Sequence, residues 1–113
     1  MQKYVTLKEN TDFNRTYYRG KSIANPALVV YSRKNGAGFC RVGITTSKKI
    51  GNAVERNRSR RVIRAAYQSV LSKDLIQGNW DLVFVARGKT KYLKSTAVEK
   101  AMISCLEELG VIK

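Results

Sequence analysis

The chain contains no histidine and only two cysteines among its 113 residues. Histidine is the commonest general base and metal ligand, so its absence argues against a self-sufficient zinc enzyme or a histidine-containing triad. Cys40 and Cys105 are too few for a disulfide framework and lack metal-site spacing, so we expect both to be core residues. No apolar run is long enough to span a bilayer, and MQKYVTLKEN lacks a signal-peptide core. We therefore expect a cytoplasmic protein with no membrane partner.

Acidic residues are also scarce, with eight Asp or Glu against 22 Lys or Arg and a net charge of +14. The three aspartates, Asp12, Asp74 and Asp81, are scattered in sequence, so no carboxylate cluster that could hold Mg²⁺ unaided is evident. We predict no catalytic residue and no metal site on this chain. The positive charge favours a polyanionic partner, with nucleic acid first and an anionic membrane second.

The length suits one domain, and 43% hydrophobic residues can supply its core. We predict a single α+β domain over residues 1–113, with elements in the approximate order αββαβα. Asn35-Gly36 predicts a hairpin between its two flanking β-rich runs. The expected elements are helix 10–19, strands 27–33 and 39–46, helix 52–72, strand 81–87 and helix 96–109.

Three capping features support the predicted helix ends. Asn10 or Thr11 can cap the first helix, and Thr96 with Glu99 has the spacing of a capping box at the start of the last one. Gly110 fits the position just beyond the carboxyl end of the last helix.

Positive charge is dense and ordered in residues 47–64, SKKIGNAVERNRSRRVIR, which hold seven basic residues and one acid. On a helical wheel the apolar side of this segment and its continuation occupies one arc, and the opposite arc holds arginines and amides. The apolar arc contains Ser59, Val62, Ile63, Ala66 and Val70, and the polar arc contains Asn57, Arg60, Arg61, Arg64 and Gln68.

A solvated helix face is the ordinary explanation of such a polar arc, but solvated faces usually mix charges of both signs. Arg56, Arg60 and Arg64 stand four residues apart without an intervening acid at that spacing. Guanidinium groups bind phosphate oxygens in a bidentate manner and stack on bases, so this arrangement favours structured RNA.

A second candidate site lies in the first predicted helix. Phe13 and Tyr17 are four residues apart and share a face, while Tyr31 shares a strand face with Arg33. Such rings could stack on the bases of a single strand. The pattern alone also fits a simpler role, in which Phe13 and Tyr17 attach the helix to the core.

The block KKIGNAV at residues 48–54, followed by RNR at 56–58, resembles the signature of the protein subunit of bacterial ribonuclease P. The similarity extends to Asp12-Phe13, to LVVYSR, to RVGITTS and to the last helix, and so covers nearly the whole chain. The resemblance implies an α/β sandwich with a small mixed sheet and a left-handed βαβ crossover, like the second domain of ribosomal protein S5.

The same resemblance implies a function. The protein would bind the catalytic RNA of ribonuclease P, an endoribonuclease that removes the 5′ leader from precursor tRNA. The RNA would carry the chemistry with Mg²⁺, and the protein would bind the leader and support substrate and metal affinity. We expect the protein alone to be inactive and to be a monomer in isolation.

Family positions then fall on particular residues of this chain. The leader would meet Phe13, Tyr17 and Tyr31, and we add Arg33 from its strand face. The catalytic RNA would meet Lys48, Lys49, Asn52, Arg56, Asn57, Arg58, Arg60, Arg61 and Arg64. The alternative is a non-catalytic RNA-binding protein of the ribosomal type, which would not need both the arginine arc and an aromatic leader site.

Overall fold

The computed structural model describes residues 5–36 and 38–112, so both ends of the predicted domain and residue 37 lie outside the described residues. Within these ranges one five-stranded mixed sheet is flanked by three α-helices and two short 3-10 helices. In chain order the elements are β1 (Val5–Thr6), α1 (Asn10–Arg19), β2 (Lys21–Ala24), β3 (Leu28–Lys34), β4 (Arg41–Thr45), η1 (Lys48–Ile50), α2 (Ala53–Ser72), β5 (Trp80–Ala86), η2 (Thr90–Tyr92) and α3 (Ser95–Glu108). The predicted fold class is confirmed.

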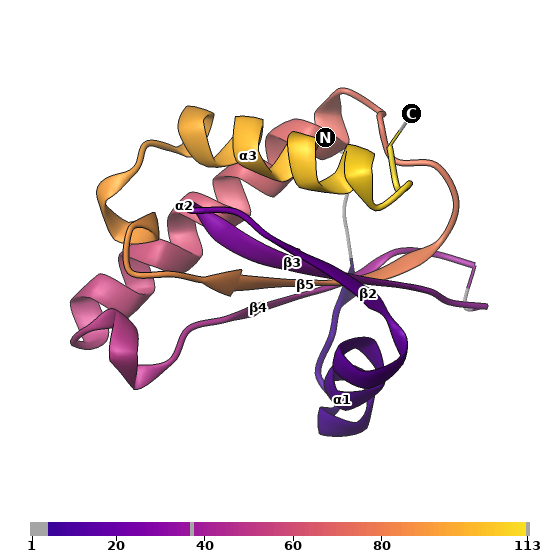
Figure 1. The fold of residues 1–113 in the computed structure, drawn as a ribbon, viewed down its shortest axis with the longest axis horizontal. Coiled ribbons are helices and arrows are strands. Elements are labelled where there is room, and N and C mark those ends of the chain that lie inside the picture. Colours follow the sequence, from indigo (N-terminus) through magenta and orange to yellow (C-terminus); the bar gives the residue numbers. More distant parts are fainter. Residues whose placement is uncertain (1–4, 37, 113) are drawn as a thin grey trace.

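The helices lie on opposite faces of the sheet (Figure 1), with α2 and α3 together on one face and α1 on the other. Strand residues alternate between the two faces, so each strand supplies side chains to both layers. The main core lies between the sheet and the α2–α3 pair. Its fully buried side chains include Leu28, Val30, Val42, Leu82, Phe84, Ile63, Tyr67, Val70, Val98, Met102 and Leu106.

The predicted hairpin between β3 and β4 is wrong. The strand order is β1-β4-β5-β3-β2, so β5 lies between these two strands and pairs antiparallel with β3 and parallel with β4. Residues 81–84 of β5 are all buried, and a strand covered on both faces belongs in the middle of a sheet. The loop after β3 therefore passes the end of β5, where the Asn35 amide donates to the Asn79 carbonyl at 3.1 Å.

The hairpin that does form joins β2 and β3, and the sequence did not predict β2. Asn25 and Leu28 exchange backbone hydrogen bonds of 2.9 and 3.2 Å, which leaves Pro26 and Ala27 as the two turn residues. Pro26 thus lies in a turn, where its fixed φ is accommodated. β1 and β2 are short and mostly exposed edge strands, so neither shows the apolar alternation that marks a buried strand.

Two of the predicted helix caps are also wrong. The residue before α1 is Glu9 and the residue before α3 is Lys94, and neither makes a side-chain capping bond. Thr96 is already the second residue of α3, and Glu99 instead pairs with Lys73 of α2. Gly110 has φ of +80°, as expected for a residue that ends a helix in the left-handed region.

The two thiols have different surroundings. Cys105 is buried, as predicted, and the loss of solvation raises the pKa of its thiol. Cys40 precedes β4 and is only half-buried, so its predicted core position is only partly correct.

The α2 helix connects the parallel strands β4 and β5, as the predicted βαβ unit requires. The left hand of this crossover stays a prediction. None of the helices in residues 5–36 and 38–112 is long and apolar enough to cross a membrane.

Candidate nucleic-acid interfaces

The polar side of α2 is exposed along its first three turns. We call Asn57, Arg60, Arg61 and Arg64 the arginine face; all four are exposed, whereas Ser59, Ile63 and Ala66 on the other side are buried. Val62, which the helical wheel placed in the core, is half-buried. The four residues of the arginine face line an open groove together with Val54.

Among the described residues, the guanidinium groups of the arginine face have no partner. No side-chain hydrogen bond or ion pair is made there by Arg60, Arg61 or Arg64, or by Arg56, which lies one turn before Arg60. Like charges four residues apart destabilise a helix by a few tenths of a kcal/mol per pair. These arginines therefore do not stabilise the fold, and their guanidinium groups remain available to an external anion.

Glu55, the single acid of the basic segment, is used at the start of α2. The Asn52 side chain accepts a bond from the Glu55 amide, and the Glu55 carboxylate accepts one from the Asn52 amide, so the two residues form a capping box. The same carboxylate pairs with the Lys91 ammonium at 2.8 Å. Hydrogen bonding to Lys91 and to Asn52 lowers the pKa of Glu55, and bonding to Glu55 raises the pKa of Lys91.

Two of the predicted RNA-binding residues thus have structural contacts that the sequence did not indicate. Asn52 caps α2, and Arg58 donates through Nε to the Lys91 carbonyl at 2.6 Å, which ties α2 to η2. Lys48 and Lys49 lie in η1, directly before this cap, and both are exposed. The nine predicted residues therefore all lie between η1 and the third turn of α2, where Arg56 is half-buried and the other eight are exposed. Asn52 and Arg58 also hold the backbone in place.

The aromatic residues of the second candidate site come together between α1 and the sheet. The Tyr17 and Tyr31 ring centroids are 4.9 Å apart in an edge-on arrangement, and Phe13 and Tyr17 are 6.4 Å apart. Phe13 lies directly over Gly43 of β4, where an added Cβ would come within 2.5 Å of its ring. All three rings are half-buried. They attach α1 to the sheet and remain partly exposed, so both interpretations of the sequence remain compatible with this geometry.

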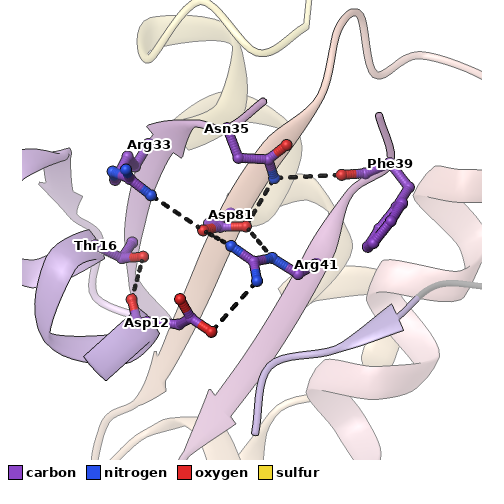
Figure 2. Close-up of polar contacts among 7 residues, drawn as sticks. All are labelled: Asp12, Thr16, Arg33, Asn35, Phe39, Arg41 and Asp81. Carbon is purple, nitrogen blue, oxygen red and sulfur yellow. Dashed lines mark hydrogen bonds and ion pairs between the residues drawn. The ribbon is translucent and has the colours of Figure 1, made fainter. Parts of the chain in front are cut away.

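A charged network that was not predicted from the sequence lies on the same face of the sheet, where Arg41 reaches α1; Figure 2 shows its residues. Asp81 of β5 is fully buried, and Arg41 binds its two carboxylate oxygens through Nε and Nη2 at 2.8 and 2.7 Å. The Asn35 side-chain amide donates through Nδ2 to Asp81 at 2.7 Å, and the Arg33 guanidinium lies 3.4 Å from the same carboxylate. Arg41 also reaches Asp12 of α1 at 3.3 Å.

The strand register explains the network. Arg33, Asp81 and Arg41 are cross-strand neighbours on β3, β5 and β4, and all three face α1. Hydrogen bonding to Asp81 and its negative charge raise the pKa of Arg41. Arg41 thus binds two aspartates, Asp12 and Asp81, that are distant in sequence. Arg33 makes a longer contact and has a quarter of its side chain exposed, so its guanidinium group keeps donors for another ligand. The one signal for this network in the sequence is Asp81, a charged residue at the start of the otherwise apolar run 82–86.

Comparisons with known proteins give one family. The family model described as "Ribonuclease P" matches residues 1–110. The ribonuclease P protein component of Clostridioides difficile is 42% identical over 93% of this chain and 91% of its own length, and that of Clostridium botulinum (strain Loch Maree) is 40% identical over 93% and 94%.

Solved structures agree. The Staphylococcus aureus RNase P protein superposes with a TM-score of 0.82 at 34% identity, covering 98% of this chain and 100% of that one. The Thermotoga maritima RNase P protein gives a TM-score of 0.76 at 28% identity, with 99% of both chains covered. The resemblance in the KKIGNAV and RNR blocks therefore holds over the sequence and over the fold, and the chain belongs to the family of ribonuclease P protein components.

Proposed function

We propose that this protein binds the catalytic RNA of ribonuclease P through η1 and the arginine face of α2. The observation that carries this proposal is that Arg60, Arg61 and Arg64 are exposed and that their guanidinium groups have no partner among the described residues. Repulsion between like charges on one side of a helix destabilises that helix, so these arginines do not serve the fold. Their guanidinium groups are suited to bind the phosphate oxygens of a structured RNA. With that RNA, the protein supports removal of the 5′ leader from precursor tRNA in the cytoplasm.

The leader is assigned to the opposite side of the sheet. Phe13, Tyr17 and Tyr31 come together and are partly exposed there, and Arg33 lies two residues along β3 from Tyr31. Stacking on aromatic side chains tolerates any base, which suits leaders of varied sequence. The protein thus has two RNA-binding surfaces, separated by the sheet.

The chemistry is assigned to the RNA with its Mg²⁺. The residues described here offer a poor site for the ion, because Asp81 is engaged by two arginines and Asp12 by one of the same pair. Nor do the described residues contain a group of three His, Cys, Asp or Glu side chains suited to a metal. The protein contributes by binding and orienting the RNA.

Reconstitution tests the proposal. Adding the protein to ribonuclease P RNA and precursor tRNA at low Mg²⁺ should increase the rate of 5′ maturation, whereas rigorously RNA-free protein should cleave nothing. Absence of any enhancement would overturn the proposal, and cleavage by the protein alone would place the chemistry on the chain.

The two surfaces can be separated by mutation. Arg60→Ala with Arg64→Ala should weaken binding to the catalytic RNA and reduce the salt slope of that binding by roughly 1 to 2. A double variant at Lys8 and Lys100, two exposed cations elsewhere, is the charge-matched control. Tyr31→Ala should instead weaken binding of precursor tRNA to the holoenzyme, with little effect on mature tRNA. Equal effects of both changes on both RNAs would contradict the two-surface arrangement.

A further inference from the structure

A third basic surface lies at one end of the sheet, outside the arginine face and the α1 rings. The β2–β3 turn and the segment after β5 meet there (Figure 1) and enclose an open groove of about 510 Å³. Its lining includes Asn25 and Pro26 from the turn, Arg87 and Lys89 after β5, and Tyr92 of η2. We call it the Tyr92 groove.

Tyr92 is exposed although its neighbours are firmly held. Thr90 is fully buried; its hydroxyl donates to the Ala27 carbonyl at 2.5 Å and accepts from the Arg87 amide at 2.9 Å. Lys91 donates to the Ile50 carbonyl at 2.7 Å and pairs with Glu55. Between these anchors and α3, the Tyr92 side chain is 76% exposed. The backbone on both sides of Tyr92 is thus fixed, while the Tyr92 ring remains largely in solvent.

The groove beside the ring is lined by basic residues, and the nearby acid, Glu55, is paired with Lys91. No acidic residue lines the groove, Arg87 and Lys89 are exposed, and the Lys91 ammonium lies 5.2 Å from the Tyr92 ring centroid. Arg87 uses one guanidinium nitrogen on the Asn25 carbonyl at 3.3 Å, which orients the rest of the group. A presented ring beside cations matches the combination that single-stranded nucleic acid binds, with a base on the ring and phosphates on the cations.

The position of the groove identifies which RNA it would meet. Arg58 of α2 donates to the carbonyl of Lys91, the residue next to Tyr92, so the groove continues the basic surface of η1 and α2. We propose that the Tyr92 groove binds an unpaired segment of the ribonuclease P RNA, with Tyr92 stacking on a base and Lys89 contacting a phosphate. This inference rests on the proposed function, because it extends the surface assigned to that RNA.

Three variants test whether the Tyr92 ring contributes to RNA binding. Tyr92→Ala should weaken binding of the protein to ribonuclease P RNA about 5- to 150-fold, the range that the loss of one stacked base gives. Tyr92→Phe keeps the ring and should bind within about 2-fold of the unchanged protein. Tyr18→Ala removes an even more exposed tyrosine from α1, on the other face of the sheet, and should leave this binding unchanged. Urea midpoints of all three should match the unchanged protein, since both side chains are exposed.

The phosphate contact has its own test. Lys89→Ala should reduce the salt slope of RNA binding by about 0.7, the value for one phosphate contact on a single strand, whereas Lys100→Ala on the exposed side of α3 should not.

The outcomes separate this inference from the proposed function. If Arg60→Ala with Arg64→Ala weakens RNA binding and Tyr92→Ala does not, the groove proposal fails and the proposed function stands. If neither weakens it, both fail. A loss in Tyr92→Phe as large as in Tyr92→Ala would overturn stacking. An effect of Tyr92→Ala confined to precursor tRNA would overturn the assignment to the catalytic RNA.

Discussion

At the scale of single residues, Asp81 holds two arginines and an amide, and through Arg41 it is linked to α1. Its side chain is fully buried, while those of Arg33 and Arg41 are about a quarter exposed. The carboxylate is therefore a structural group of the α1 face and fixes the two guanidinium groups beside the rings.

Asp81→Asn should lower the free energy of unfolding by about 2 to 3 kcal/mol. Loss of one partner from a buried ion pair costs about 3 to 5 kcal/mol, and the partial exposure of both arginines reduces this cost. Urea denaturation measures the change. Asp74→Asn is the matched control, because Asp74 is exposed and asparagine tolerates its φ of +54°. Equal effects of the two substitutions would contradict the structural role of Asp81.

At the scale of elements, the approach of α1 to the sheet depends on a glycine. Gly43 on β4 provides the space for the Phe13 ring, and an added Cβ would lie 2.4 Å from the nearest ring atom. No side chain other than hydrogen fits there unless Phe13 moves, so α1, its rings and the strand are coupled.

Gly43→Ala should therefore displace Phe13, destabilise the protein by about 1 to 3 kcal/mol and weaken precursor tRNA binding to the holoenzyme. Gly36→Ala, where an added Cβ meets nothing within 4 Å, is the control in the same urea and binding measurements. Combining Gly43→Ala with Phe13→Ala should cost less than the sum of the single changes, because the clash is then removed. Full additivity would show that the two residues are not coupled.

At the scale of the whole molecule, charge governs stability as well as binding. Glu55 pairs with Lys91 and Glu99 with Lys73, so each pair joins segments distant in sequence. The lysine bond is the largest cause that lowers the pKa of each glutamate below its ordinary value of 4.5. The unfolded chain consequently binds protons more readily at these positions than the folded one.

Stability from these pairs should be fully present above pH 4.5 and be lost as the pH falls through the lowered folded-state pKa values. Urea midpoints measured between pH 6 and pH 3 should fall for the unchanged protein. Glu55→Gln, which keeps the capping geometry but does not titrate, should show a smaller acid loss. An identical acid loss in both proteins would contradict the contribution of Glu55.

Much of the molecule follows from local sequence pattern. The bounds of α1 and α2 agree closely with those predicted, and the buried and exposed sides of α2 separate as the helical wheel indicated. The pairing of strands was not predictable in this way, because Asn35-Gly36 has the local features of a hairpin turn whether or not its strands pair. The burial of β5 between β3 and β4 outweighs that local preference.

The sequence by itself therefore determined the basic face of α2, since a period of 3.6 residues places side chains on a helix without reference to the rest of the chain. It also carried the family motifs. Only the tertiary structure decided that Arg33, Asp81 and Arg41 form a network, that Asn52 and Arg58 hold α2 in place, and that η2 presents Tyr92. These contacts join residues up to 63 positions apart, and sheet register and helix packing, which no local periodicity specifies, bring them together.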